Sequence, residues 1–246
     1  MAFTGVRALS TLGTLLRSFT HGHALHLHAV HRRFLGELVR PAPLLPGADQ
    51  VAFIDVDSTH KRVFGRAKQG AQIGRIKGVR TLHPLLATIS TPTAGPIVAA
   101  ARLRQGRSAD SRGAMRLVTE ALATAPQVGA TGIRVLRADS QFYNADVVAA
   151  CRRADARFSI TCGMNPSIKR AISAIGEDAW TQIRSPTGVL DPDTGELIYD
   201  AQVAEIPAYT AFTGVDAPVQ HRPRPTRERL TCHYPPPDGP DRNPNT

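Results

Sequence analysis

The sequence predicts an α/β fold, and three observations support this prediction. Residues 51–57 (VAFIDVD) form an apolar, β-branched run that ends in acidic residues, which is typical of a strand. Further strand-like runs follow it, and segments with helical spacing of apolar residues stand between the later runs. Strands that alternate with helices in this way indicate an α/β architecture. The further strands are predicted at 84–91, 96–104, 132–138 and 157–162, and the helices at 111–125, 144–155 and 166–176.

The N-terminal segment, residues 1–48, is predicted to be helical. Apolar residues recur at helical spacing over 10–38, Ser10 is a suitable N-cap, and Gly22 is expected to divide the segment into two helices. Prolines follow, and they end helical structure because they lack a backbone N–H. The spacing depends on Leu12, Leu15, Leu16, Phe19, Leu27, Val30, Phe34 and Leu38, and the prolines are Pro41, Pro43 and Pro46.

Residues 49–185 are predicted to form the core domain, in which the helix at 111–125 begins at Asp110 or Ser111. The stretch 60–80 is rich in basic residues and glycine and is predicted to be a hairpin or loop. It either holds DNA phosphates or is a solvated surface loop, and the sequence leaves both open. The residues expected to contact phosphates are Arg62, Arg66, Lys68, Arg75, Lys77 and Arg80, with Arg102, Arg104 and Arg107 as a second, less favoured patch.

The C-terminal part of the chain changes character. Residues 186–216 are rich in turn-forming residues and are predicted to begin a β-rich insertion. Eight of the 19 prolines lie in 217–246, where apolar periodicity disappears. We therefore expect a disordered, Pro/Arg-rich tail.

Composition narrows the range of partners. The formal net charge is +10, and a protein this basic attracts polyanions, of which nucleic acid is the commonest. Membrane surfaces and acidic proteins are weaker alternatives. Aromatic residues make up only 5% of the chain, which disfavours recognition of single strands by base stacking. No apolar run is long enough to cross a bilayer, and the three cysteines include no CxxC pair, so a zinc finger is not expected.

The candidate chemistry lies in two acids, Asp57 and Asp139, each at the end of a predicted strand. Neighbouring carboxylates repel each other unless a cation lies between them, and hard ions such as Mg²⁺ prefer oxygen ligands. Such ions stabilise the attacking and leaving oxygens of a phosphodiester displacement. Asp55 would face the same side of the strand as Asp57, so either could be the ligand. The structural alternative, that these acids are turn or cap residues, is strong on pattern alone.

Several motifs, in order along residues 5–215, resemble those of DDE-class insertion-sequence transposases, group 1 type. The segment from Phe53 to Thr59 (FIDVDST) resembles the first acidic motif of that family, and 68–71 (KQGA) follows it as in one group of these enzymes. The segment 137–140 (RADS), with Phe142 and Tyr143 after it, resembles the second acidic motif. Familial phrases also occur at 157–160 (RFSI), 177–180 (EDAW) and in the opening segment 5–19.

The resemblance implies a ribonuclease-H-like core in which three acids bind divalent metal, Mg²⁺ or Mn²⁺. Family members cleave DNA at the transposon ends and join those ends to target DNA. The first acid falls on Asp57 and the second on Asp139. The implied partner is double-stranded DNA, with no membrane, and a homodimer is the usual working form. The implied location is the bacterial cytoplasm, in association with the nucleoid.

The third acid of the family is a Glu on a helix beyond the β-rich insertion. This sequence departs from the family there, because the Pro/Arg-rich tail follows Asp216, and Glu228 has no helical pattern around it. We therefore expect an incomplete ribonuclease-H-like core, in a copy truncated or frameshifted at the C-terminus and shortened at the N-terminus. Such a chain would carry out little or no complete transposition, and whether it is an enzyme stays open. The alternatives are a non-catalytic DNA-binding remnant and a chain without a stable fold.

Five histidines lie on the first helical segment. Residues three apart on a helix are neighbours, so metal binding is compatible with their spacing. A solvated or DNA-facing helix is the preferred interpretation. The residues are His21, His23, His26, His28 and His31.

Overall fold

A computed structural model describes the chain from residue 8 to residue 233. The gaps in this range are residues 66–67, 75, 77, 110, 184–188, 191, 193–194, 196, 199–201, 210–218 and 224–229.

The centre of the molecule is a mixed sheet of eight strands in the order β13-β14-β15-β8-β7-β1-β5-β6. β1 pairs in parallel with β7, and β7 in parallel with β8, whereas β5 and β6 are antiparallel to their neighbours. All five sequence-predicted core strands are confirmed. Their bounds are β1 Val51–Ser58, β5 Leu85–Ser90, β6 Ile97–Arg102, β7 Ile133–Ala138 and β8 Arg157–Cys162.

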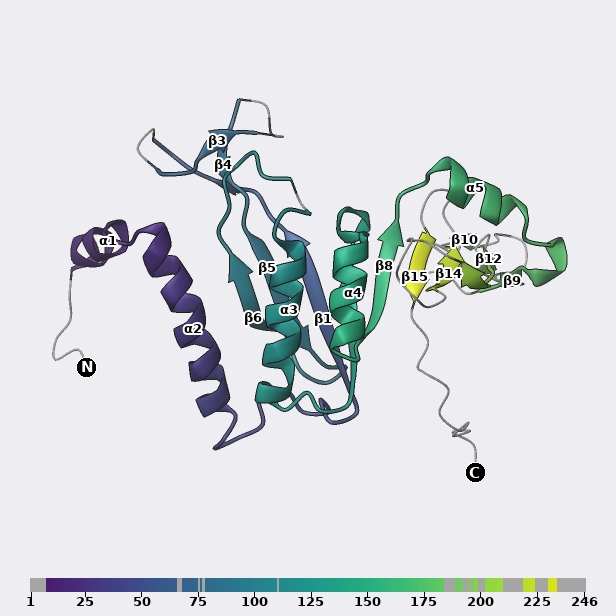
Figure 1. Ribbon diagram of the computed structural model, residues 1–246, viewed down its shortest axis with the longest axis horizontal. Coiled ribbons are helices and arrows are strands. Elements are labelled where there is room, and N and C mark those ends of the chain that lie inside the picture. The colour runs from purple at the N-terminus through teal and green to yellow at the C-terminus, as the bar shows by residue number, and fades with distance from the viewer. Residues whose placement is uncertain are drawn as a thin grey trace.

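Two helices, α3 (Ala114–Thr124) and α4 (Ala145–Arg153), pack on one face of this sheet (Figure 1). The strands alternate accordingly: in β1, Ala52, Ile54 and Val56 are buried, while the residues between them are partly open. The predicted opening of α3 by Asp110 or Ser111 is wrong. The helix begins after Gly113, whose left-handed backbone (φ 79°) favours glycine.

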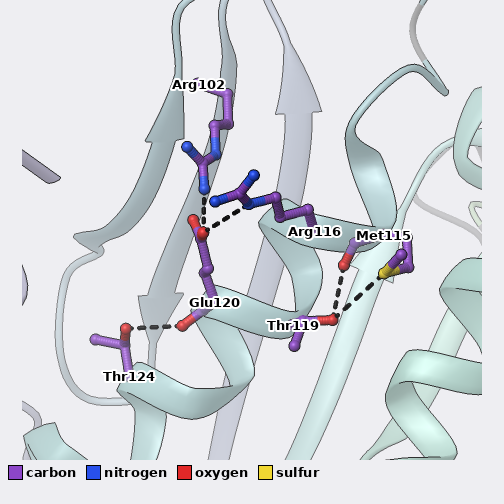
Figure 2. A network of polar contacts seen from close by, with 6 residues as sticks. All are labelled: Arg102, Met115, Arg116, Thr119, Glu120 and Thr124. Carbon is purple, nitrogen blue, oxygen red and sulfur yellow. Dashed lines mark hydrogen bonds and ion pairs between the residues drawn. The ribbon is translucent and has the colours of Figure 1, made fainter. Parts of the chain in front are cut away.

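Polar contacts also fix α3 to the edge of the sheet. Figure 2 shows Glu120 of α3 between Arg102 of β6 and Arg116 of its own helix. The Oγ1 of Thr124 donates to the carbonyl of Glu120 at 2.8 Å, which satisfies a buried hydroxyl. The position of the helix therefore depends on a charge pair in addition to its apolar face.

The helical structure predicted over 10–38 is confirmed as two helices, α1 (Leu9–Arg17) and α2 (His21–Leu38). The break lies at 18–20 instead of Gly22, and Ser10 lies inside α1 and is not its cap. Thr20 caps α2: its Oγ1 accepts from the His23 backbone N–H, and its own N–H donates to His23 Nδ1 at 3.0 Å. The α2 helix runs beside the edge strand β6 (Figure 1), where His31 Nε2 lies 2.7 Å from the Val98 carbonyl oxygen.

The basic stretch after β1 forms a small three-stranded sheet in the order β2-β4-β3. Gly106 passes so close to it that a Cβ there would overlap the backbone carbonyls of Thr81 and Gln72. The absence of a side chain at Gly106 therefore allows the loop after β6 to pack against the small sheet. Its strands are β2 Lys61–Arg62, β3 Gln72–Ile73 and β4 Arg80–Leu82.

After β8, the described residues form a short α-helix and several short strands. The helix at Pro166–Ser173 (α5) confirms the predicted short helix, and the Asn165 side chain caps it. The short strands are β9 Thr181–Gln182, β10 Val189–Leu190, β11 Leu197–Ile198, β12 Gln202–Val203 and β13 Ile206–Tyr209.

Short 3₁₀ helices join some of the longer elements. The helix η1 (Ala125–Val128) connects α3 to β7, η2 (Ser140–Phe142) connects β7 to α4, and η3 (Glu177–Ala179) connects α5 to β9.

Two strands fall within the segment 217–246, for which the sequence predicts a disordered tail. They are β14 (Val219–Pro223) and β15 (Leu230–His233), and β15 pairs antiparallel with β8. Pairing there satisfies backbone groups of β8 that would otherwise form a sheet edge. Residues 224–229 and 234–246 of the tail lie outside the described part of the chain.

The strand order β6-β5-β1-β7-β8, with three antiparallel strands followed by two parallel ones, is that of a ribonuclease-H-like core. The predicted fold class is therefore confirmed. The domain boundaries proposed from the sequence, at 48/49, 185/186 and 216/217, stay predictions.

The packing between sheet and helices predicts the effect of truncating a core side chain. Leu136 of β7 is fully buried opposite Ile54 of β1. Leu136→Ala should lower the free energy of unfolding by about 2–5 kcal/mol, because it removes apolar contacts and leaves a cavity. The matched control is Ile133→Ala on the same strand, where the side chain is 43% exposed. Equal losses in the two variants, measured by chemical denaturation, would contradict the assigned core.

Candidate metal centre at the ends of β1 and β7

The fold brings Asp57 and Asp139 to adjacent positions on neighbouring parallel strands. The last paired residues of β1 and β7 are Val56 and Ala138, and the two acids are the next residues along each chain. The backbone of Asp139 is still extended (φ −79°, ψ 178°), so the strand direction continues through it. Adjacent strands lie about 4.8 Å apart, and carboxylates at such positions are close enough to share one cation.

Both acids belong to the face of the sheet opposite α3 and α4. Residues of a strand alternate between its two faces, and Ile54 and Val56 of β1 are buried under the helices. Asp55 and Asp57 therefore share the other face, and Asp57 is exposed to solvent there. This face is where a solvated ion and a phosphate backbone could reach the carboxylates.

Local backbone contacts orient the two carboxylates. The Ser58 N–H donates to Asp57 Oδ1 at 2.6 Å, and the Gln141 N–H donates to Asp139 Oδ1 at 3.0 Å. The second contact is the N-cap of η2, whose Phe142 is fully buried and anchors the turn. A backbone N–H thus orients one oxygen of each carboxylate.

Asp55 has a different environment. Its Oδ1 accepts from Arg137 Nε at 2.6 Å and its Oδ2 from Arg137 Nη2 at 2.7 Å, a bidentate ion pair across the β1–β7 pairing. The Arg137 guanidinium also lies over the ring of Phe53, 4.3 Å from its centroid. The hydrogen bond to Asp55 raises the pKa of Arg137 above its usual value. The sequence showed Arg137 only as part of a motif, because strand register is a tertiary property.

The donor set of Asp57 and Asp139 fits a hard divalent cation, because both supply carboxylate oxygens on an open face. No cluster of three or more His, Cys, Asp or Glu side chains suited to a metal occurs among the residues that the structure describes. The two acids are therefore a partial ligand set, completed in such sites by water, substrate oxygens or a further acid.

The basic residues expected to contact DNA have different surroundings. Arg62 and Lys68 are exposed, and the Arg62 guanidinium lies 4.9 Å from the ring centroid of Phe64. Arg80 instead donates from Nη2 to the Ala71 carbonyl at 2.7 Å and stabilises the small sheet. Arg66, Arg75 and Lys77 lie outside the described residues.

The second basic patch, Arg102, Arg104 and Arg107, has structural contacts in this fold. Arg102 pairs with Glu120 (Figure 2), and Arg104 Nε donates to the His83 carbonyl at 2.8 Å. Arg107 Nε donates to the Ile73 carbonyl at 2.7 Å. These guanidinium groups hold loops and the helix α3 in place, which weakens the case for phosphate binding by this patch.

Two histidines that the sequence analysis did not single out lie beside the turn that follows Asp57. The rings of His60 and His83 are stacked, with centroids 4.0 Å apart and planes 8° from parallel. His83 is buried, its Nδ1 is 3.0 Å from the Ser108 carbonyl oxygen, and the neighbouring Pro84 carbonyl accepts from the Thr59 N–H at 3.1 Å. The stack supports the turn that follows Asp57. Its two members are far apart in sequence, so no local pattern indicates it.

A ribonuclease-H-like sheet with acids at the ends of β1 and the next parallel strand is typical of proteins that process nucleic acids. The sequence model of the family described as Transposase DDE domain group 1 matches residues 5–205. The chain therefore belongs to that family of DDE transposases, as its motifs indicated. A comparison with curated proteins finds no match. Among the described helices, none is both long and apolar enough to cross a membrane.

The buried thiol of Cys151 yields a prediction about reactivity. Burial in α4 raises the pKa of the Cys151 thiol to about 12, so almost no thiolate forms at pH 8. Alkylation of the native protein at pH 8 should be at least about a hundredfold slower at Cys151 than after unfolding. Peptide mapping by mass spectrometry resolves this residue from the other cysteines. Rapid native labelling of Cys151 would contradict the packing of α4 and allow a nucleophilic role.

Proposed function

We propose that this protein acts in DNA transposition as the metal-binding and DNA-binding core of a DDE transposase. Family membership supports a function in transposition, and the family generally uses divalent metal ions. The observation that carries the proposal for this chain is the parallel pairing of β1 with β7. It aligns Asp57 with Asp139 on the open face of the sheet.

In this proposal Asp57 and Asp139 hold Mg²⁺ or Mn²⁺. Bound there, the ion would stabilise the charge that develops on the oxygens of a phosphodiester under attack. The residues of the chain hold the carboxylates: the Ser58 and Gln141 N–H groups each fix one oxygen, which reduces the entropy lost when an ion binds.

The DNA would bind at the end of the core from which the small sheet β2-β4-β3 projects. That sheet follows directly after the acid-bearing end of β1, and Figure 1 shows it projecting from the same end of the core. Among the described residues that are expected to contact phosphates, Arg62 in β2 and Lys68 between β2 and β3 are exposed. The net charge of +10 supports attraction of a polyanion.

We further propose that this chain alone supports little strand transfer. The family uses a third acid beyond the β-rich insertion, and Glu228, in the C-terminal segment of this chain, lies outside the described residues. Two carboxylates neutralise and position an ion less completely than three, so the transition state is less stabilised.

Metal binding tests the proposed centre. Asp57→Asn and Asp139→Asn should each weaken Mn²⁺ binding at least about tenfold, because each removes one charged ligand without changing the side-chain shape. The control is Asp155→Asn, in the turn between α4 and β8, where φ is 49° and Asn is well tolerated. Calorimetric titration that gives the same Mn²⁺ affinity for Asp139→Asn and the unchanged protein would contradict the centre.

DNA binding tests the basic surface independently of the metal. Affinity for duplex DNA should fall at least about tenfold between about 50 and about 200 mM salt, and Lys68→Ala should reduce the salt slope by about one. Arg107→Ala is the matched control, because its guanidinium is engaged with the Ile73 carbonyl. Affinity indifferent to salt in fluorescence anisotropy would contradict phosphate binding. Salt-dependent binding without any Mn²⁺ site would favour a non-catalytic DNA-binding protein.

A further inference from the structure

Asp55 and Arg137 form a bidentate ion pair near the proposed centre. Both contacts of the pair are short, 2.6 and 2.7 Å, and they use both oxygens of the carboxylate and two nitrogens of the guanidinium. The two residues are in register across the β1–β7 pairing. Planar, bidentate pairs of this kind are the strongest form of the arginine–carboxylate contact.

The ring of Phe53 fixes the plane of the guanidinium. Phe53 and Asp55 lie two residues apart on β1, so both face the same side of the sheet as Arg137. The Arg137 guanidinium carbon is 4.3 Å from the ring centroid. The arginine therefore has an aromatic surface beneath it and a carboxylate at its edge, which restricts its side-chain rotation.

The Asp55–Arg137 pair lies two residues before Asp57 and Asp139 on the same two strands. Asp55 precedes Asp57 by two residues on β1, and Arg137 precedes Asp139 by two residues on the continuation of β7. This step is about 6.7 Å along a strand, and all four side chains share one face. Three carboxylates thus lie on one small area, and one of them is neutralised by Arg137.

We infer that Arg137 is a positioning residue that keeps Asp55 out of the ligand set. This inference rests on the proposed metal centre. It acts as an internal counter-ion for Asp55, so that both oxygens of this carboxylate are engaged by the guanidinium. Asp55 then adds no uncompensated negative charge beside Asp57 and Asp139. Asp55, which the sequence offered as an alternative ligand, is assigned a structural role.

A double-mutant cycle on the full chain tests this inference, with Mn²⁺ affinity and thermal stability as separate readouts. Arg137→Gln frees Asp55 beside the centre and should tighten Mn²⁺ binding by about three- to tenfold. Asp55→Asn leaves the arginine charge uncompensated and should weaken binding by a similar factor. Both variants lose the same ion pair, so both should lower Tm by similar amounts. A purely structural role would not move the metal affinity in opposite directions.

The double variant Asp55→Asn with Arg137→Gln should return the Mn²⁺ affinity to within about twofold of the unchanged protein, while its Tm stays low. If Asp55 is a ligand, the double variant stays at least about tenfold weaker, and the inference is wrong. The control for net charge is Arg134→Gln, on β7 but on the opposite face, where Nη2 donates to the Asp155 carbonyl. An equal gain of affinity in Arg134→Gln would also overturn the inference.

These outcomes separate the inference from the proposed function. Loss of Mn²⁺ binding in Asp57→Asn and Asp139→Asn, combined with no change in Arg137→Gln, would refute the counter-ion role and leave the centre intact. If neither acid variant affects Mn²⁺ binding, the proposed centre itself fails. The inference then falls with it.

Discussion

The parallel pairing of β1 with β7 is the constraint on which the rest of this structure depends. It sets Ile54 against Leu136 in the buried layer, Asp55 against Arg137 on the open face, and Asp57 beside Asp139 where the strands end. Parallel strands require a crossover connection, and here β5, β6 and α3 provide it. A shift of register by one residue would turn every one of these side chains to the wrong face.

The helices decide which face is available for chemistry. Because α3 and α4 cover the side of Ile54 and Val56, the acids must lie on the side without these helices. The charge pair of Glu120 with Arg102 (Figure 2) helps to hold α3 over β5 and β6. Apolar packing and the metal face are thus two consequences of the same alternation along β1.

Arginine has several different roles in this chain, and the net charge does not distinguish them. Arg62 is exposed on the small sheet, Arg80 and Arg107 hold backbone carbonyls, and Arg137 pairs with a carboxylate on an aromatic ring. A guanidinium engaged in such contacts would have to give them up before it could bind phosphate. The basic composition therefore indicates a polyanion partner, while the individual contacts indicate which side chains are available to it.

The sequence by itself determined the fold class, the core strands, the helices and the two candidate acids, because alternation and helical spacing are local properties. It misplaced the cap of α1 at Ser10 and that of α3 at Asp110 or Ser111, since capping depends on which hydrogen bonds the folded backbone leaves open. The tertiary structure alone decided that Asp55 belongs with Arg137 and that His60 stacks on His83. These contacts join residues far apart in the chain, and only strand register and packing bring them together.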